Sequence, residues 1–283
     1  MISLDAATVL LQWAAGGWLF LWVTTRRREV GLGYGWLMRG VFLGLAIGAV
    51  AIAASFEWVP ARDWLSVLMI AVGIGALGSS ILRKSAGVSG QRAVVERRSA
   101  RVAAMTGIDR AEQRFDDDAA EFSPVWDLAT AVIGLVALIP AGIHAGDPAT
   151  LAVARTLVGA LFLGAITDAM LLGHWYLVQP GLARAPLLEL VRWSAALWPV
   201  QLAVLLWPTG MISVLTGDID DGYGGLLGWF WAACVVATIV LLGVTRAALK
   251  EREYSAVMAA TGLLYLAILT AFGMDLVARA TLA

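Results

Sequence analysis

Seven stretches of the chain are free of charged residues over a length that can cross a bilayer, and this pattern limits the possible folds more than any other feature. The stretches lie between Asp5 and Arg26, Arg39 and Glu57, Asp63 and Arg83, Asp127 and Asp147, Arg192 and Asp218, Asp221 and Arg246, and Glu253 and Asp275. An eighth apolar stretch, from about Thr150 to Val178, contains Arg155 and Asp168. Since a spanning helix needs about 20 mainly apolar residues, the sequence predicts eight transmembrane helices.

Composition supports a membrane protein. The chain has 283 residues, of which 60% are hydrophobic and 14% are charged, and its mean hydropathy is +0.80. A soluble domain of this size has too much outer surface to hide that many apolar side chains, whereas a bilayer acts as their solvent. We therefore expect an all-α integral membrane protein, a polytopic bundle of about eight transmembrane helices that forms one membrane domain over residues 1–283.

The distribution of basic residues predicts the orientation. Seventeen of the 20 Lys and Arg residues fall in alternate connections or beside them. They are Arg26, Arg27, Arg28, Arg39, Arg83, Lys84, Arg92, Arg97, Arg98, Arg101, Arg110, Arg114, Arg184, Arg192, Arg246, Lys250 and Arg252. By the positive-inside rule these connections are cytoplasmic, and eight helices then place both termini outside. The first apolar run is of spanning length and is followed directly by Arg26, which resembles a reverse signal anchor rather than a cleavable signal peptide.

The longest connection, 83–123, is predicted to be a cytoplasmic loop. Its first half is basic and its second half is acidic. The residues concerned are Arg92, Arg97, Arg98 and Arg101, then Asp116, Asp117, Asp118 and Glu121. The basic half can be attracted to anionic lipid and the acidic half can contact a soluble partner. A solvated, partly helical loop is the favoured interpretation, because charge runs are commonly just exposed.

Asp168 is the clearest candidate for a polar site inside the membrane. Ionisable residues within a span are rare, and each one suggests a function together with a partner. Helical spacing places Asp168 on the face of Trp175, so that it points away from His174. A hydrogen bond to a neighbouring helix, for instance through Gln12, Gln201 or Arg39, is the structural alternative. The two interpretations weigh about equally.

The string from Gly173 to Gly181 (GHWYLVQPG) is the most distinctive local motif. It brings His174 and Tyr176 to the cytoplasmic interface, where Pro180 and Gly181 should end the helix. His174 can be a haem ligand, a proton donor to a quinone, or an interfacial anchor, and the anchor is favoured because aromatic belts are common. The other histidine, His144, is expected at the opposite membrane face, so one chain cannot supply two histidine ligands to a haem.

The sixth predicted helix contains an interior proline. Pro199 should kink this helix and free a backbone carbonyl, with Gln201 just beyond. A broken helix of this kind can line a solute site, as in transporters. A tolerated kink is the favoured interpretation, because neighbouring helices can satisfy the freed group.

Glycines recur at packing intervals in two helices. Gly40, Gly44 and Gly48 lie four residues apart, which predicts a close helix contact either within the chain or between two copies. Gly73, Gly75 and Gly78 match GxGxxG in form. They lack the preceding strand of a dinucleotide fold, so we interpret them as packing glycines.

Other chemistries are poorly supported. Cys234 is the single cysteine, which excludes an intramolecular disulfide and a multi-cysteine metal site. The acidic turn at 218–222 lacks the remaining ligands of a calcium loop and is predicted to be exposed. We find no hydrolase triad, phosphate loop or zinc motif in a fitting context. The sequence therefore predicts no metal site and leaves any cofactor open.

Two functional classes remain. The first, which we favour, is a non-catalytic or quinone- and lipid-contacting subunit of a larger complex in a bacterial cytoplasmic membrane. The second is a small-solute or proton-coupled transporter, suggested by Asp168, Pro199 and Gln201. We expect the lipid bilayer, other membrane subunits or a second copy through Gly40, Gly44 and Gly48 as partners, and no nucleic acid.

Overall fold

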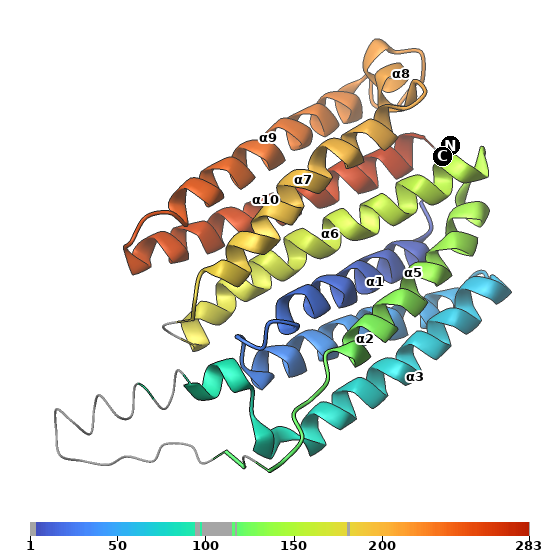
Figure 1. The fold of residues 1–283 in the computed structure, drawn as a ribbon. Helices are drawn as coiled ribbons and strands as arrows, with labels where there is room; N and C mark the ends of the chain where they lie inside the picture. The colour runs from blue at the N-terminus through green and yellow to red at the C-terminus, as the bar shows by residue number, and fades with distance from the viewer. Residues whose placement is uncertain (1–3, 94–96, 98–114, 117, 180–181, 283) are drawn as a thin grey trace.

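The computed structural model describes residues 4–93, 97, 115–116, 118–179 and 182–282, and every regular element in these ranges is helical (Figure 1). The helices are α1 (Ala6–Thr25), α2 (Leu32–Ser55), α3 (Pro60–Leu82), α5 (Val125–Ala145), α6 (Ala149–Val178), α7 (Ala185–Leu206), α8 (Gly210–Thr216), α9 (Leu226–Ala248) and α10 (Tyr254–Thr281), with a short 3₁₀ turn, η1, at Lys84–Ala86. Pro180 and Gly181 lie outside the described residues, as do Arg98, Arg101 and Asp117 of the long loop.

Seven of these helices are long and apolar enough to cross a membrane, and α7 with α8 forms an eighth, broken span bent by 66°. The predicted polytopic helical bundle is therefore confirmed. Pro208 follows the last residue of α7, Leu206, at the bend, whereas α7 continues without interruption through Pro199. The favoured interpretation of Pro199 as a tolerated interior proline therefore agrees with the structure, whereas the alternative, a span broken at Pro199, is wrong; the break follows the end of α7, at Pro208.

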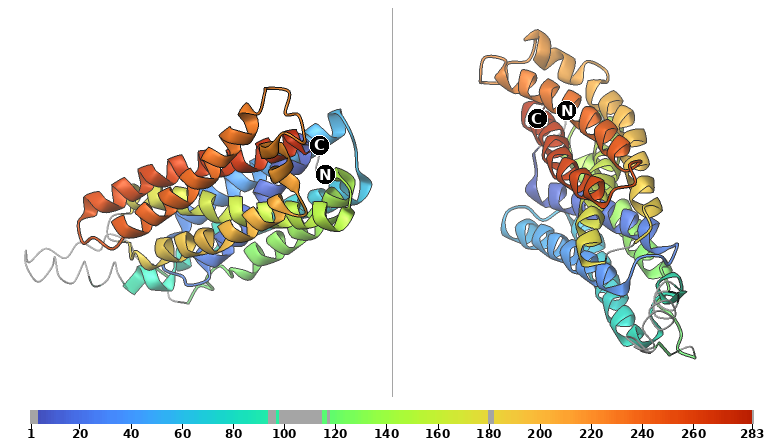
Figure 2. Two further views of the ribbon diagram at one scale, coloured as in Figure 1. Left: turned by 90° about the horizontal axis from the view of Figure 1, so that it is seen from above. Right: turned by 90° about the vertical axis from the view of Figure 1, so that its left-hand side faces the viewer.

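Both termini lie at one end of the bundle, as an even number of spans requires (Figure 1, Figure 2). We call the other end the basic end; it holds the connections 26–31 and 249–253 and the described parts of the connections 83–124 and 179–184. Among the predicted inside arginines that the structure describes, three lie in spanning helices rather than in connections. Arg39, Arg192 and Arg246 lie within helices, and Arg39 is only 1% exposed.

The eight spans form two rings of four helices. In the first half α1, α2, α3 and α5 contact one another in ring order, and in the second half α6, α7, α9 and α10 do the same. The end-on view of Figure 2 shows the yellow-to-red helices grouped apart from the blue-to-green ones. The rings meet mainly where α1 packs on α6, with α5 also touching α6. The two halves therefore share a helix order, although their sequences show no residue match.

Glycines set the closest approach between the rings. A Cβ atom added at Gly16 would lie 1.8 Å from the carbonyl oxygen of Ala160, and one at Gly164 would lie 2.2 Å from the carbonyl carbon of Gly16. Backbone therefore meets backbone where α1 crosses α6, which only residues without a side chain permit. Trp18 is fully buried beside this crossing, and Gly73 of α3 packs against it, with its Cβ position 3.0 Å from the indole.

The stripe of Gly40, Gly44 and Gly48 does not pack within the chain as closely as its spacing suggested. Cβ positions at Gly40 and Gly44 meet nothing within 4 Å, and at Gly48 only Leu10 approaches, at 3.4 Å. The stripe thus faces outward along α2. Of the two predicted uses of this face, an internal contact is wrong for Gly40 and Gly44, and contact with a second copy stays a prediction.

The described parts of the long loop fold back on the bundle. Glu121 accepts hydrogen bonds from Arg28 and Arg92, and the amide of Gly90 donates to the carbonyl of Arg28 over 3.1 Å. Burial alone raises the pKa of Glu121, but the hydrogen bonds from Arg92 and Arg28 outweigh it and hold the pKa below its usual value. At least one acidic residue of this loop therefore serves an internal contact.

The acidic turn at the opposite end caps a helix. Asp221 accepts hydrogen bonds from the backbone N–H groups of Tyr223, Gly225 and Leu227, over 2.8–2.9 Å. These bonds, that of Gly225 first, hold the pKa of Asp221 below its usual value. Its oxygens thus satisfy backbone donors at the start of α9.

Candidate functional site

Asp168 lies fully buried in the middle of α6 and is bonded to a residue that the sequence did not single out. The hydroxyl of Tyr34, from α2, donates to Asp168 Oδ1 over 3.3 Å. Asp168 Oδ2 is also buried and has no hydrogen-bond partner among the described residues. A buried carboxylate oxygen without a partner is costly in a membrane interior and is a natural place for a proton or a water molecule.

The three partners proposed for Asp168 are all engaged elsewhere or unpaired. Arg39 donates twice to Asp127, Nε to Oδ1 over 2.8 Å and Nη2 to Oδ2 over 2.7 Å. Gln12 donates to Asp275, and Gln201 is buried with neither side-chain atom hydrogen-bonded to a described residue. None of these three residues pairs with Asp168, but the structural alternative of a hydrogen bond to a neighbouring helix is met by Tyr34 of α2.

Trp175 connects this pair to the surface. Its ring meets the ring of Tyr34 edge to face, with 5.9 Å between centroids. Its indole N–H donates to Gln179 Oε1 over 3.0 Å. Asp168 and Trp175 are seven residues apart on α6, so the helical spacing already placed them on one face. Sequence reasoning passed over Trp175 as a site residue, as it did Tyr34, although for Trp175 that signal was available.

Trp175 also forms one wall of a recess at the basic end, with a volume of about 330 Å³. The recess is lined by Gly31, Leu32, Gly33, Trp36, Lys84, Gly87, Gln91, Phe115, Trp175, Val178 and Gln179. Three aromatic rings thus surround a space that also presents an ammonium and two amides. The first turn of α2 opens into it, and a Cβ atom added at Gly33 would lie 3.0 Å from the Trp175 ring.

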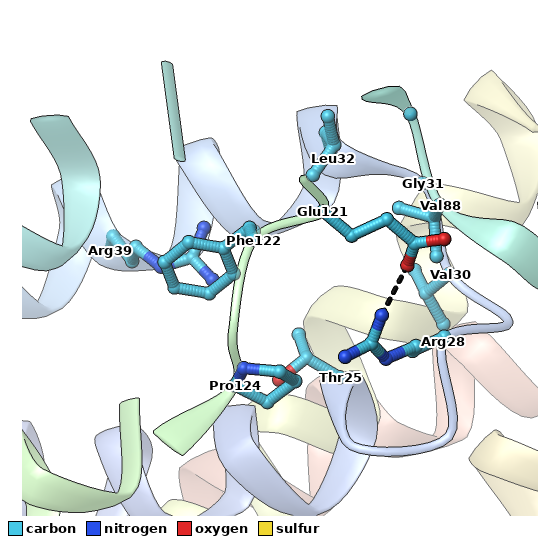
Figure 3. A pocket seen from close by; sticks show the side chains of 12 residues that line it. Thr25, Arg28, Val30, Gly31, Leu32, Arg39, Val88, Glu121, Phe122 and Pro124 are labelled. Atoms are coloured by element: carbon cyan, nitrogen blue, oxygen red, sulfur yellow. Dashed lines mark hydrogen bonds and ion pairs between the residues drawn. The ribbon is translucent and has the colours of Figure 1, made fainter. Parts of the chain in front are cut away.

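A smaller cavity of about 30 Å³ adjoins this recess (Figure 3). Gly31, Leu32 and Gly87 line both spaces. Phe122 lies over the Arg39 guanidinium, with 4.2 Å from its central carbon to the ring centroid. Figure 3 shows this stack and the ion pair of Arg28 with Glu121 at the other side of the cavity. The space has room for about one or two water molecules.

The ion pair of Arg39 with Asp127 holds the first ring together. Asp127 also accepts a hydrogen bond from Thr25 Oγ1 over 3.2 Å, and Arg39 Nη1 donates to Ser80 Oγ over 3.2 Å. The four residues come from α2, α5, α1 and α3. One buried, bidentate pair therefore links all four helices of the first ring, which explains how a charge can stand inside a spanning bundle.

A second buried cluster links the two rings. Asp275 Oδ2 accepts from Gln12 Nε2 over 3.1 Å and from Arg279 Nε over 2.9 Å, and Arg279 also donates to Gln12 Oε1. Gln12 lies in α1 and the other two lie in α10. Because the two charges satisfy each other, α10 continues to Thr281, past the charge-free stretch that predicted it.

Three neighbouring residues of the histidine motif, His174, Trp175 and Tyr176, lie in different environments. His174 lies on the exposed face of α6, edge to face with Tyr265 at 6.4 Å, which is consistent with an interfacial anchor. Tyr176 is buried, and its hydroxyl donates to the carbonyl of Ala183 over 2.5 Å. Trp175, between them, faces the recess. His144 lies at the opposite end, 3.2 Å from a carboxylate oxygen of Glu57, so the two histidines occupy opposite ends as predicted.

Pro199 and Gln201 do not form one site. Pro199 is exposed on the outer face of α7, whereas Gln201 is fully buried. The carbonyl of Val204 lacks the usual helical hydrogen bond, because Pro208, four residues later, has no N–H to donate to it. Arg155 replaces that donor, with Nε 2.9 Å from the Val204 oxygen and Nη2 2.8 Å from the Trp207 oxygen.

Comparison of the chain with protein-family models, with curated proteins and with solved structures found no match. A function must therefore be inferred from the chain's own geometry. That geometry brings together Tyr34, Asp168 and Trp175, and sets His174, Tyr176, Pro199 and Gln201 apart from them and from one another.

Proposed function

We propose that the chain is a membrane-embedded subunit that holds the headgroup of a lipid-soluble quinone at the basic end, within a larger complex of a bacterial cytoplasmic membrane. The observation that carries this proposal is the aromatic recess, whose wall residue Trp175 meets the ring of Tyr34, which is in turn hydrogen-bonded to the buried Asp168. The chain supplies the binding surface, and electron transfer belongs to partner subunits.

The chemistry of the recess fits a quinone. A quinone headgroup is a flat ring with two carbonyl oxygens, so it needs apolar faces to stack on and donors for its oxygens. Trp36, Phe115 and Trp175 offer the faces, and the Lys84 ammonium and the Gln91 amide offer the donors. Interfacial depth also fits, because an isoprenoid tail must reach the hydrocarbon while the headgroup stays near polar groups.

The test is photolabelling of the detergent-purified protein with an azido-benzoquinone that carries a short alkyl tail. We expect cross-links in residues 31–36 or 175–179, suppressed by excess unlabelled quinone. Gly33→Leu should lower labelling about tenfold, because its side chain would occupy the recess against Trp175. Gly243→Leu is the matched control, since its Cβ position meets nothing within 4 Å.

Labelling that is equal in the folded Gly33→Leu and Gly243→Leu proteins would contradict the recess as the quinone site. Purification in mild detergent supplies an independent check. Redox subunits should co-purify with the chain, and a lone monomer or homodimer would count against the larger complex.

A proton-coupled transporter is the second candidate, supported by a specific observation. Asp168 Oδ2 and, at a separate position, both polar atoms of Gln201 are buried without partners among the described residues, so each can take up a proton or a polar group of a solute. If the chain is such a transporter, the interior of proteoliposomes that contain the wild-type protein should acidify in response to a solute gradient. Asp168→Asn should abolish that signal, and Asp220→Asn, in the exposed turn, should preserve it. Absence of any proton flux with the wild-type protein would reject transport.

A further inference from the structure

A second recess lies at the basic end, beside the start of α7, and has a volume of about 460 Å³. It is lined by Arg27, Ala185, Leu188, Glu189, Arg192, Trp193 and Ala196. None of these residues lines the aromatic recess of the proposed quinone site. A ligand bound here is therefore independent of the proposed function.

The mouth of this recess carries excess positive charge. Arg26 and Arg27 both pair with Glu189, one on each carboxylate oxygen, over 2.6 Å and 3.0 Å. Arg192 adds a third guanidinium and makes no ion pair or hydrogen bond with another residue of the described ranges. Three arginines and one glutamate leave a local charge of +2. Glu189, with 15% of its side chain exposed, fixes the arginines in place without neutralising them.

The floor of the same recess is apolar and continues along α7. Leu188 lies beside the charged residues, and Trp193 and Ala196 follow Glu189 and Arg192 along α7, so the surface changes from cationic to apolar toward the C-terminal part of the helix. Trp193 is 44% exposed and meets Phe20 edge to face at 6.0 Å. Such a half-exposed indole is typical of the level where lipid headgroups meet acyl chains.

We propose that this recess binds an anionic phospholipid of the leaflet at the basic end. The guanidinium groups of Arg27 and Arg192 would hold the phosphodiester oxygens, and the upper part of one acyl chain would lie against Trp193 and Ala196. Guanidinium groups suit this role because they donate paired hydrogen bonds to phosphate oxygens. Clusters of basic residues beside a span also attract anionic headgroups.

The test is lipid titration of the purified protein followed by native mass spectrometry, with phosphatidylglycerol and phosphatidylcholine as probes. The wild-type protein should bind phosphatidylglycerol more tightly than phosphatidylcholine. The double variant R27Q/R192Q should lose about tenfold to thirtyfold in affinity for phosphatidylglycerol, and its affinity for phosphatidylcholine should not change. Arg246→Gln is the matched control, because Arg246 is exposed at the same end of the bundle and lies outside the recess.

A third variant separates a lipid site from simple charge attraction. Ala196→Trp leaves every charge in place and fills the apolar floor, so it should also weaken phosphatidylglycerol binding. Inorganic phosphate should compete poorly, since it lacks the acyl chain. Equal binding of the two lipids, an equal loss in Arg246→Gln, full affinity in folded R27Q/R192Q or Ala196→Trp, or effective competition by phosphate alone would each overturn the proposal.

Discussion

Replacing Asp127 by alanine is expected to lower the free energy of unfolding by about 3–5 kcal/mol. The substitution leaves the Arg39 guanidinium buried at 1% exposure without the two hydrogen bonds of 2.8 Å and 2.7 Å that now hold it. The loss is large because an unpaired buried charge costs more than the pair itself contributes. Unfolding of the purified protein in mixed micelles of mild detergent and dodecyl sulfate measures it.

The double variant R39M/D127L tests whether the loss in Asp127→Ala comes from the unpaired charge of Arg39. It removes both charges and keeps a similar volume of side chain, so most of the lost stability should return. Asp220→Ala, in the exposed turn at the opposite end, should change the free energy of unfolding by less than about 0.5 kcal/mol. An Asp127→Ala protein as stable as wild type would show that the pair does not hold the first ring together.

The second large effect is expected at the crossing of α1 and α6. Gly16→Ala places a methyl group 1.8 Å from the carbonyl oxygen of Ala160, and no side-chain movement can relieve a clash with backbone. The helices must separate, which should cost at least about 3 kcal/mol, the upper end of the usual overpacking penalty. Dodecyl sulfate unfolding again measures the change.

Gly44→Ala is the matched control for this variant, because its Cβ position meets nothing within 4 Å. The added methyl should leave unfolding of the monomer unchanged. The same control bears on the outward stripe, since a loss of self-association in Gly44→Ala would place that face between two copies. Equal unfolding curves for Gly16→Ala and Gly44→Ala would contradict the backbone contact between the rings.

The helices could be predicted from the sequence because lipid tolerates few charges, so each charge-free run marks a span. The same rule misplaced the residues that matter most inside the bundle. It treated Arg39, Asp127 and Asp275 as limits of spans, although all three are buried within helices. Arg39 and Asp127 are 88 residues apart, and no local pattern reveals that two such charges will neutralise each other.

The candidate site was predictable in part. Asp168 was found from its charge, and its heptad spacing to Trp175 pointed to the right face of α6. Tyr34 carried no signal, because a tyrosine near a helix end is ordinary in a membrane protein. The recess itself combines the start of α2, the segment around Lys84 and the end of α6, and only the tertiary arrangement brings these together.

The cluster of Gln12, Asp275 and Arg279 also has a consequence for biogenesis. Asp275 and Arg279, in α10, lie 263 and 267 residues after Gln12, in α1. During synthesis the first ring can close while the second is still being made, since domains form from the N-terminus onward. Gln12 then has neither of its two hydrogen-bond partners until α10 has been synthesised and inserted. A chain truncated before Asp275 would leave the buried Gln12 side chain without both of these partners, so the contact between α1 and α10 forms only after α10 has been made.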